Sequence, residues 1–305
     1  MISETVPGAL DGERLDRVVS IVADLSRAAA AALIEAGAVR LDGEAASAGK
    51  VRVRAGQALE VDPGRLPAPA RPGPDPDLPL DVAYEDEDLV IVDKRAGVVV
   101  HPGAGHAAGT LVHALLARYP EMATVGDPTR PGIVHRLDAG TTGLLVAART
   151  RRAYEGLVAA LQRRDVEREY VALVWGVPSA PSGVVDAPIG RDQRDLTRMA
   201  VVVGGRDART HYRVEAAHAT PAPLARLTCR LETGRTHQIR VHLASLGHPV
   251  VGDATYGGAR VRLRAPRPML HARRLAFAHP VTGVRVERES PIPADMAEVL
   301  ARCGD

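Results

Sequence analysis

The segment GIVHRLDAGTTGLLV, residues 132–146, contains one carboxylate, Asp138, between an arginine and a run of small and hydroxylic residues. The residues that follow it, 139–143, place no bulky side chain beside the carboxylate in sequence. An isolated aspartate in such a position is commonly a turn or helix-cap residue. It can also act as a reagent if a guanidinium close by holds it ionised. The rest of the chain must supply that cation if Asp138 is to do chemistry.

Two further segments place reactive side chains beside turn residues, VDKRAGVVVHPGAG at 92–105 and LETGRTHQIRVHLASLGHPVVGDATYGG at 231–258. In the second segment a dense array of hydrogen-bond donors follows a Thr-Gly turn, and it consists of Arg235, His237, Gln238 and Arg240. Along an extended strand, Gln238 and Arg240 would share one face, and Arg235 and His237 would also share a face. On a strand, the array would therefore present two of these side chains on each face.

Several common chemistries are not supported by the sequence. It contains no GxxxxGK[ST] loop, no dinucleotide-binding glycine spacing and no GxSxG turn. Among the 11 histidines, His101 and His106 are five apart, as are His237 and His242. A spacing of five points two side chains to different faces of either a helix or a strand. We therefore expect no metal site and no cofactor.

The composition is that of a soluble globular protein, with 305 residues, 46% hydrophobic residues and 25% charged residues. No apolar run approaches the length that spans a bilayer, and the N-terminal residues show no signal-peptide pattern. Two cysteines, Cys229 and Cys303, do not make a disulfide framework. These features predict a cytoplasmic protein that is not bound to a membrane.

Positive charge is unevenly distributed along the chain, although the net charge is only +2. Between residues 254 and 286 there is no acid. This block contains seven arginines, namely Arg260, Arg262, Arg264, Arg267, Arg273, Arg274 and Arg285. A basic face of this kind favours a polyanionic partner.

Residues 1–62 are predicted to form a small α/β domain. Ser26 is the expected N-cap of a helix over RAAAAALIEA, which Gly37 ends. Asp42-Gly43 predicts a hairpin turn. Further on, the basic residues Lys50, Arg52 and Arg54 alternate with Val51 and Val53, which predicts a strand with its charges on one face and its valines on the other.

A Pro- and Gly-rich segment, residues 63–79, is the predicted linker, because its composition favours an extended spacer. From residue 80 to 305, β-rich runs such as DLVIVD, GLLVAA, EYVALVWG and ARLTCRLE mix with the amphipathic stretches TLVHALLARY and YEGLVAALQRR. The runs do not alternate strictly with the amphipathic stretches. We therefore expect an α+β domain with a mixed, mostly antiparallel sheet.

GIVHRLDAGTTGLLV and LETGRTHQIRVHL together resemble the signature of the RluA/RluD-type pseudouridine synthases. The resemblance extends over residues 79–293 and includes REYVALVWG and LHARRLAFAHPVTG. The N-terminal residues resemble an S4 RNA-binding domain. The resemblance implies a catalytic domain of the pseudouridine synthase type that isomerises uridine to pseudouridine in RNA, and the RNA we expect is 23S ribosomal RNA of the large subunit.

The resemblance also implies roles for individual residues. Asp138 would be the reacting carboxylate, and Arg240 of the HQIR motif would hold it ionised. Tyr170 resembles the active-site tyrosine of the family, although EYVALVW would also be a good core strand. Arg136 would occupy the space that the flipped nucleotide leaves. His135 is expected to support the loop by hydrogen bonding.

The remaining basic residues are expected to contact RNA. Lys94, Arg235 and His237 are assigned to RNA backbone contact or to loop support. Salt-dependent, sequence-independent affinity is expected from Arg52 and Arg54 of the first domain and from Arg260, Arg262 and Arg264 of the acid-free block. RNA is thus the predicted partner of a protein that we expect to be a monomer.

Two other classes of function stay open at this point. The first is a non-catalytic S4-type RNA-binding or ribosome-assembly factor. The second is a glycosidase-like hydrolase, which would need a second carboxylate such as Glu169 or Glu232. The single tryptophan and the 3% aromatic content make a sugar-stacking cleft a poor fit to this chain.

Overall fold

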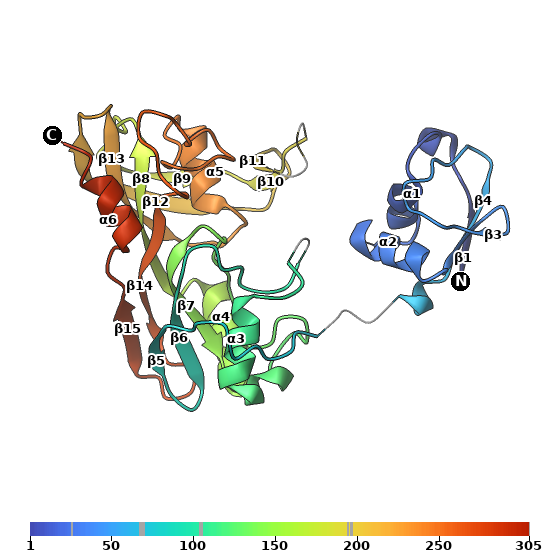
Figure 1. Cartoon of the computed structure of the whole chain (residues 1–305), viewed down its shortest axis with the longest axis horizontal. Helices are drawn as coiled ribbons and strands as arrows, with labels where there is room; N and C mark the ends of the chain where they lie inside the picture. Colours follow the sequence, from blue (N-terminus) through green and yellow to red (C-terminus); the bar gives the residue numbers. More distant parts are fainter. Residues whose placement is uncertain (26, 67–70, 104–105, 194, 196–197, 305) are drawn as a thin grey trace. The chain divides into compact units, whose positions relative to one another are not determined.

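The computed structural model describes residues 1–25, 27–66, 71–103, 106–193, 195 and 198–304. The chain forms two compact units, Met1–Ala70 and Arg71–Asp305 (Figure 1). Ser26, the expected helix cap, lies outside the described residues. In the described part of the chain, no helix is both long and apolar enough to cross a membrane.

The first unit is a small sheet with two helices. Its four strands are ordered β1-β4-β2-β3 and its neighbouring strands are antiparallel. The elements are β1 (Ile2–Thr5), α1 (Leu15–Val22), α2 (Arg27–Glu35), β2 (Val39–Leu41), β3 (Glu44–Ala45) and β4 (Ala58–Val61). Leu15, Leu33 and Leu59 belong to the apolar core between helices and sheet. This unit therefore has a core of its own.

Local predictions for the first unit were right at the turns and wrong at one strand. Gly37 follows α2 with a φ of +66°, and Asp42-Gly43 forms the β2–β3 turn with φ values of +53° and +81°. Residues 50–54 do not form a strand, because Arg52 makes only an isolated bridge with Arg14. The expected sharing of faces fails as well, since Val53 is buried while Val51 is 39% exposed.

The second unit is built on a nine-stranded sheet, ordered β5-β6-β7-β14-β8-β13-β12-β9, with β15 also pairing β14. The strands are β5 (Val82–Glu85), β6 (Leu89–Lys94), β7 (Thr142–Ala148), β8 (Glu167–Trp175), β9 (Ser182–Asp186), β12 (Arg209–His218), β13 (Leu224–Leu231), β14 (Leu270–Ala278) and β15 (Arg285–Glu289). A separate hairpin joins β10 (Ile189–Arg191) to β11 (Met199–Val201). The β7–β14 pair is parallel, and every other pair in the sheet is antiparallel. The predicted α+β class with a mostly antiparallel sheet is confirmed.

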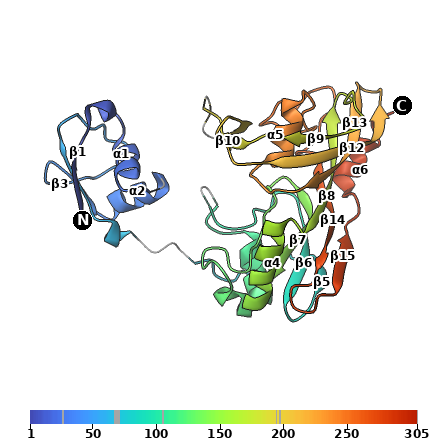
Figure 2. The ribbon, with the colours of Figure 1, turned by 180° about the vertical axis from the view of Figure 1, so that it is seen from behind.

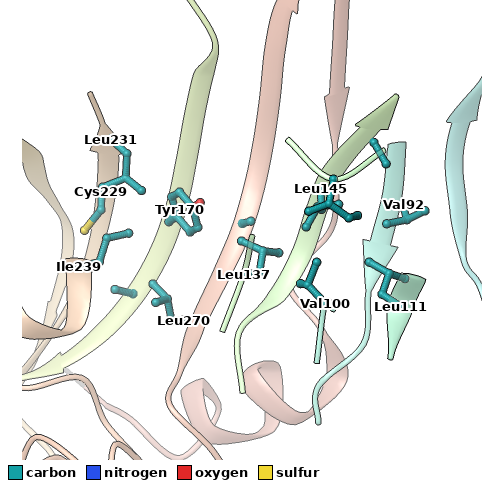
Figure 3. Close-up of a cluster of buried hydrophobic side chains, with 14 of the residues drawn as sticks. Val92, Val100, Leu111, Leu137, Leu145, Tyr170, Cys229, Leu231, Ile239 and Leu270 are labelled. Carbon is teal, nitrogen blue, oxygen red and sulfur yellow. The ribbon is translucent and has the colours of Figure 1, made fainter. Parts of the chain in front are cut away.

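Helices cover both faces of this sheet, because β7 is buried at every position and β6 at all but one. Alternate residues of β6 and β7 enter two different cores. The first core includes Leu145 of β7 and side chains of α3 (Leu111–Arg118) and α5 (Gln238–Ser245), and Figure 3 shows part of it. The second includes Leu144 and side chains of α4 (Arg151–Arg163), which lies against β7 (Figure 2). Both faces are therefore closed to water around β7.

The predicted linker at 63–79 is anchored at both ends. Pro63–Arg65 forms a short 3-10 turn, and Leu66 packs against the core of the first unit. At the other end, the Asp75 amide donates a hydrogen bond of 3.0 Å to the His113 carbonyl in the second unit. The domain boundary that the sequence suggested stays a prediction.

Candidate active site

A cavity of about 660 Å³ opens in the second unit beside the loop that precedes β7. Its walls come from that loop, α4, β8 and the turn that leads into α5. The cavity brings together six of the residues selected from the sequence, namely Arg136, Asp138, Tyr170, Arg235, His237 and Arg240. Segments about 100 residues apart in the chain therefore meet in one wall.

Asp138 is held by the arginine that was expected to keep it ionised. Arg240 donates from Nη1 to Oδ2 of Asp138 at 3.0 Å, and the side chains of Asp138 and Arg240 are 17% and 8% exposed. The other edge of the same guanidinium contacts Asp253 at 2.6 and 2.9 Å. This bidentate pair fixes the plane of the Arg240 guanidinium, so that Nη1 can serve Asp138.

Asp253 was not selected from the sequence, although it carries much of this geometry. Its side chain is fully buried, and its Oδ1 also accepts a hydrogen bond of 3.0 Å from the Thr255 amide. Burial by itself lowers the pKa of Arg240, but the hydrogen bonds and charges of Asp253 and Asp138 raise it above the ordinary arginine value. The sequence signal that could have identified Asp253 is its place between Gly252 and the Gly257-Gly258 pair. Glycines allow a backbone to fold tightly around a buried side chain.

Two buried cations bind backbone carbonyls of the loop that carries Asp138. The Ala139 carbonyl accepts from Nζ of Lys94 at 3.1 Å, and the Gly140 carbonyl accepts from Nη1 of Arg267 at 3.1 Å. These two buried cations come from distant parts of the sequence. They orient the turn without contacting the Asp138 carboxylate.

Two roles were expected for Lys94, and its surroundings favour support of the loop over contact with RNA. The side chain is 2% exposed, and its ammonium also donates to the carbonyls of Arg95 and Val98 at 2.9 and 2.8 Å. Burial lowers the pKa of Lys94 to about 7, against the charge of Asp138, which raises it. An RNA phosphate cannot reach an ammonium that three carbonyls enclose.

A close backbone contact fixes where β7 begins. Gly143 has a φ of +105°, and a Cβ there would lie 2.2 Å from the Ala272 carbonyl oxygen of β14. Glycine therefore allows the parallel β7–β14 contact just after Asp138. On the other side of the loop, Nε2 of His135 accepts from the Val146 amide at 3.1 Å, in line with its expected supporting role.

Tyr170 lies on β8 with its ring among the core side chains Leu137, Ile239 and Leu270 (Figure 3). It is 5% exposed and lines the cavity that Asp138 also lines. Burial raises the pKa of its hydroxyl group. Within the described residues, no hydrogen-bond partner of that hydroxyl is present. The residue is thus both a core tyrosine and a wall of the cavity.

The donor array at 235–240 does not lie on a strand, so the expected sharing of faces is wrong. Helix α5 begins at Gln238, after His237 adopts a φ of +57°. The Gln238 amide accepts from Thr233 Oγ1 at 2.8 Å and donates to the Arg209 carbonyl at 3.0 Å. These bonds tie the preceding turn to β12, and the helix then points Arg240 at Asp138.

Comparison with known proteins agrees with this geometry. Residues 88–245 match the model of the family described as RNA pseudouridylate synthase, and residues 13–59 match the S4 domain. A Nitrosomonas europaea protein named ribosomal large subunit pseudouridine synthase D is 46% identical, with 98% of this chain and 87% of that protein covered. This chain belongs to the RNA pseudouridylate synthase family. It is an RNA pseudouridine synthase, and its membership of the family disfavours the two other classes of function.

Other relatives of the synthase give the same family. A Xanthomonas campestris protein with the same name is 44% identical over 97% of this chain and 90% of its own length. An uncharacterized RNA pseudouridine synthase of Mycobacterium bovis is 44% identical over 98% of this chain and 96% of its own length. Among solved structures, human RNA pseudouridylate synthase domain containing 1 is 28% identical, with a TM-score of 0.59 over 74% of this chain and 89% of that chain.

The acid-free block of the synthase is not one basic face. Four of its seven arginines make ion pairs with acids from other segments, namely Arg267 with Asp295, Arg273 with Glu169 and Glu215, and Arg274 and Arg285 with Glu167 and Glu287. The expectation failed because strand pairing brings distant acids beside these arginines. Arg260, Arg262 and Arg264 are exposed, and none has an ion pair in the described part of the chain.

The other basic residues that were expected to contact RNA bond to neighbouring groups of the protein or are exposed. His237 bonds through Nδ1 to the Tyr256 hydroxyl at 2.9 Å, and burial lowers its pKa. Arg235 donates from Nε to the Asp207 carbonyl at 2.9 Å. In the first unit Arg52 and Arg54 are exposed, and Arg52 donates to the Gly12 carbonyl at 2.6 Å. Over the described residues, no group of three or more His, Cys, Asp or Glu side chains could hold a metal ion.

Proposed function

We propose that this synthase isomerises uridines of large-subunit ribosomal RNA and that Asp138 is the group that reacts with the nucleotide. The proposal is supported by relatives that are named for the large ribosomal subunit and cover nearly the whole chain. The observation that carries the role of Asp138 is its place in the cavity wall, with Arg240 3.0 Å away. Arg240 contributes a positive charge that favours the ionised carboxylate.

The reaction rearranges one nucleotide without adding or removing atoms. The bond between C1′ and N1 breaks, the uracil turns within the cavity, and a bond between C1′ and C5 forms while the C5 proton is lost and N1 gains one. Asp138 either bonds to C1′ or removes a sugar proton to start this sequence. Tyr170, which lines the same cavity, stacks on the uracil and helps to remove the C5 proton, directly or through a water.

The target uridine must leave its stack to reach Asp138, which costs a few kcal/mol. Arg136 is exposed and lies two residues before Asp138, so it fills the space that the base leaves or binds a phosphate beside it. Arg235 and His237 line the same cavity and contribute donors at its rim. Arg260, Arg262 and Arg264 add salt-dependent attraction to RNA, as do Arg52 and Arg54.

The decisive experiment compares the wild-type protein with Asp138→Asn on large-subunit ribosomal RNA, without added metal or nucleotide. We expect Asp138→Asn to form no pseudouridine while it binds RNA with unchanged affinity. Asp165→Asn is the matched control, because Asp165 is an exposed aspartate paired with Arg163. Undiminished product from Asp138→Asn would contradict the assignment. Release of free uracil would point to a hydrolase instead.

We also propose that the synthase acts in the cytoplasm as a monomer. Arg240 and Asp253 of the same chain already hold Asp138 in place, which supports a site that one copy can form. Light scattering after size-exclusion chromatography, with and without RNA, tests this. A dimer that alone carries activity would contradict it. Pseudouridine mapping of ribosomal RNA from a deletion strain identifies the uridines that are modified.

A further inference from the structure

Arg168 is a buried arginine that the reaction described above does not use. It lies on β8 two residues before Tyr170, and it lines the cavity that contains Asp138. Its exposure is only 6%. A guanidinium keeps its charge in a protein, so burying one is costly unless a counter-charge is near.

Within the described residues no such counter-charge reaches Arg168. No carboxylate oxygen lies within the 4.0 Å that defines an ion pair, and its Nε is buried without a hydrogen-bond partner. Its hydrogen bond, from Nη2 to the Glu232 carbonyl, is long at 3.4 Å. Arg240 in the same wall contacts two carboxylates. The two arginines are buried alike, but only Arg240 is neutralised.

The carboxylates that line the cavity are engaged elsewhere. Asp138 is bound by Arg240, and Glu232 is bound by His211 at 2.6 Å and by Arg164. Neither can turn to Arg168 without leaving its own partners. A negative charge for Arg168 therefore has to come from a bound molecule.

The turn at Gly234 packs closely against the Arg168 guanidinium. A Cβ on Gly234 would lie 2.9 Å from Nη1 of Arg168, so any other residue there would crowd the guanidinium. Gly234 lines the cavity as well. Glycine at 234 therefore lets the guanidinium keep its place at the cavity wall.

We propose that Arg168 is an anion subsite inside the cavity and that it binds one phosphate of the RNA, at the target nucleotide or next to it. This inference rests on the RNA substrate proposed above. A phosphodiester carries one negative charge and oxygens that a guanidinium contacts at hydrogen-bond distance. Arg168 would thus fix the sugar of the flipped nucleotide relative to Asp138.

The test is a double-mutant cycle that combines protein variants with chemically modified RNAs. An RNA fragment that the wild-type protein modifies is made with one methylphosphonate at a time, over two nucleotides on each side of the target uridine. Binding is measured in the Asp138→Asn background, so that no turnover occurs. Neutralising the phosphate that Arg168 binds should weaken binding by about tenfold or more, as expected for a hydrogen bond between charged groups.

The same methylphosphonate should cost nothing further once Arg168→Met is added, because the contact is already lost. Gly234→Ala should reduce the same effect. Arg262→Gln is the matched control, since Arg262 is an exposed arginine outside the cavity, and it should leave the effect of this phosphate unchanged. The proposal is wrong if each methylphosphonate weakens RNA binding by the same factor with and without Arg168→Met in the Asp138→Asn protein.

Stability separates this role from a purely structural one. Removing an unpaired buried charge should leave the Tm of the free protein unchanged or raise it. A lower Tm for Arg168→Met, with no change in the methylphosphonate pattern, would make Arg168 structural and overturn the proposal. Inorganic phosphate is titrated as a competitor. Inorganic phosphate could bind while no methylphosphonate effect depends on Arg168. The subsite would then bind free phosphate, which also contradicts the proposal.

Failure of this inference can be distinguished from failure of the proposed function. A wild-type protein that forms no pseudouridine in large-subunit RNA contradicts the function itself. A protein that forms it normally, while its methylphosphonate pattern ignores Arg168, contradicts the subsite alone.

Discussion

The cavity wall and the segment 260–264 use arginine in opposite ways. Arg240 in the wall is 8% exposed and contacts Asp138 and Asp253, whereas Arg262 is exposed and has no ion pair in the described part of the chain. Breaking a buried pair costs about 3–5 kcal/mol, but a surface pair contributes about 0–1 kcal/mol. The inner charges should therefore control folding and the reaction, and the outer charges should control affinity for RNA.

The largest effect is expected for Asp253→Ala. This change leaves the Arg240 guanidinium without its bidentate partner, so the unfolding free energy should fall by about 3–5 kcal/mol. The turnover rate should fall by about 100-fold or more, because Arg240 no longer points at Asp138. Denaturant unfolding and single-turnover assays measure the two effects. Asp186→Ala is the control, because Asp186 is also paired with an arginine but is 57% exposed, and it should cost less than about 1 kcal/mol.

Gly143→Ala should be next in size. A Cβ would meet the Ala272 carbonyl at 2.2 Å with a φ of +105°, which should cost about 3 kcal/mol or more and displace the Asp138 loop. Gly283→Ala separates the two causes, since Gly283 has a φ of +74° but nothing within 4 Å of a Cβ. It should cost only about 1 kcal/mol. Equal losses of Tm in the two variants would show that the close contact with β14 is unimportant.

A smaller effect concerns pH and His135. Burial, aided by the charge of Arg168, lowers the pKa of His135 to about 3, compared with about 6.5 in the unfolded chain. Below pH 6.5 the unfolded chain binds a proton that the folded protein does not, so stability is full above pH 6.5 and is lost as the pH falls toward 3. The contribution is at most about 1.4 kcal/mol per pH unit. His135→Gln should flatten this part of the stability curve, and an unchanged slope would contradict the assignment.

The smallest effect is expected for Arg262→Gln. Its loss should weaken RNA binding a few-fold and reduce the slope of log affinity against log salt by about 0.7–0.9, with no change in stability. Arg274 belongs to the same acid-free block, but it is paired with Glu167 and Glu287. Arg274→Gln should therefore leave the salt slope unchanged. Equal slopes for both variants would remove the distinction between the two kinds of arginine.

Local patterns predicted much of the fold because the cause was itself local. The Asp42-Gly43 turn, the end of α2 at Gly37 and the apolar strands β6, β7 and β8 depend on backbone preference and on continuous apolar runs. The strand expected at 235–240 was wrong because the Gln238 amide bonds both the preceding turn and β12. Those bonds depend on tertiary contacts that spacing does not reveal.

The candidate site was predictable in its reacting groups and not in its supports. The two motifs identified Asp138 and Arg240 through resemblance. Asp253 and Arg267 act through contacts with Arg240 and with the Gly140 carbonyl, and such contacts leave no pattern in a single sequence. Lys94 was selected from the sequence with two possible roles, and its burial favours support of the loop.

The contact between Arg267 and the Gly140 carbonyl joins an early and a late part of the chain. Asp138 leaves the ribosome early, whereas Arg267 and its partner Asp295, in helix α6 (Ala294–Leu300), are made more than 120 residues later. A chain interrupted before them carries Asp138 on a loop that has Lys94 but lacks the second buried cation. The supports of the Asp138 loop are therefore complete only when nearly the whole chain has been made.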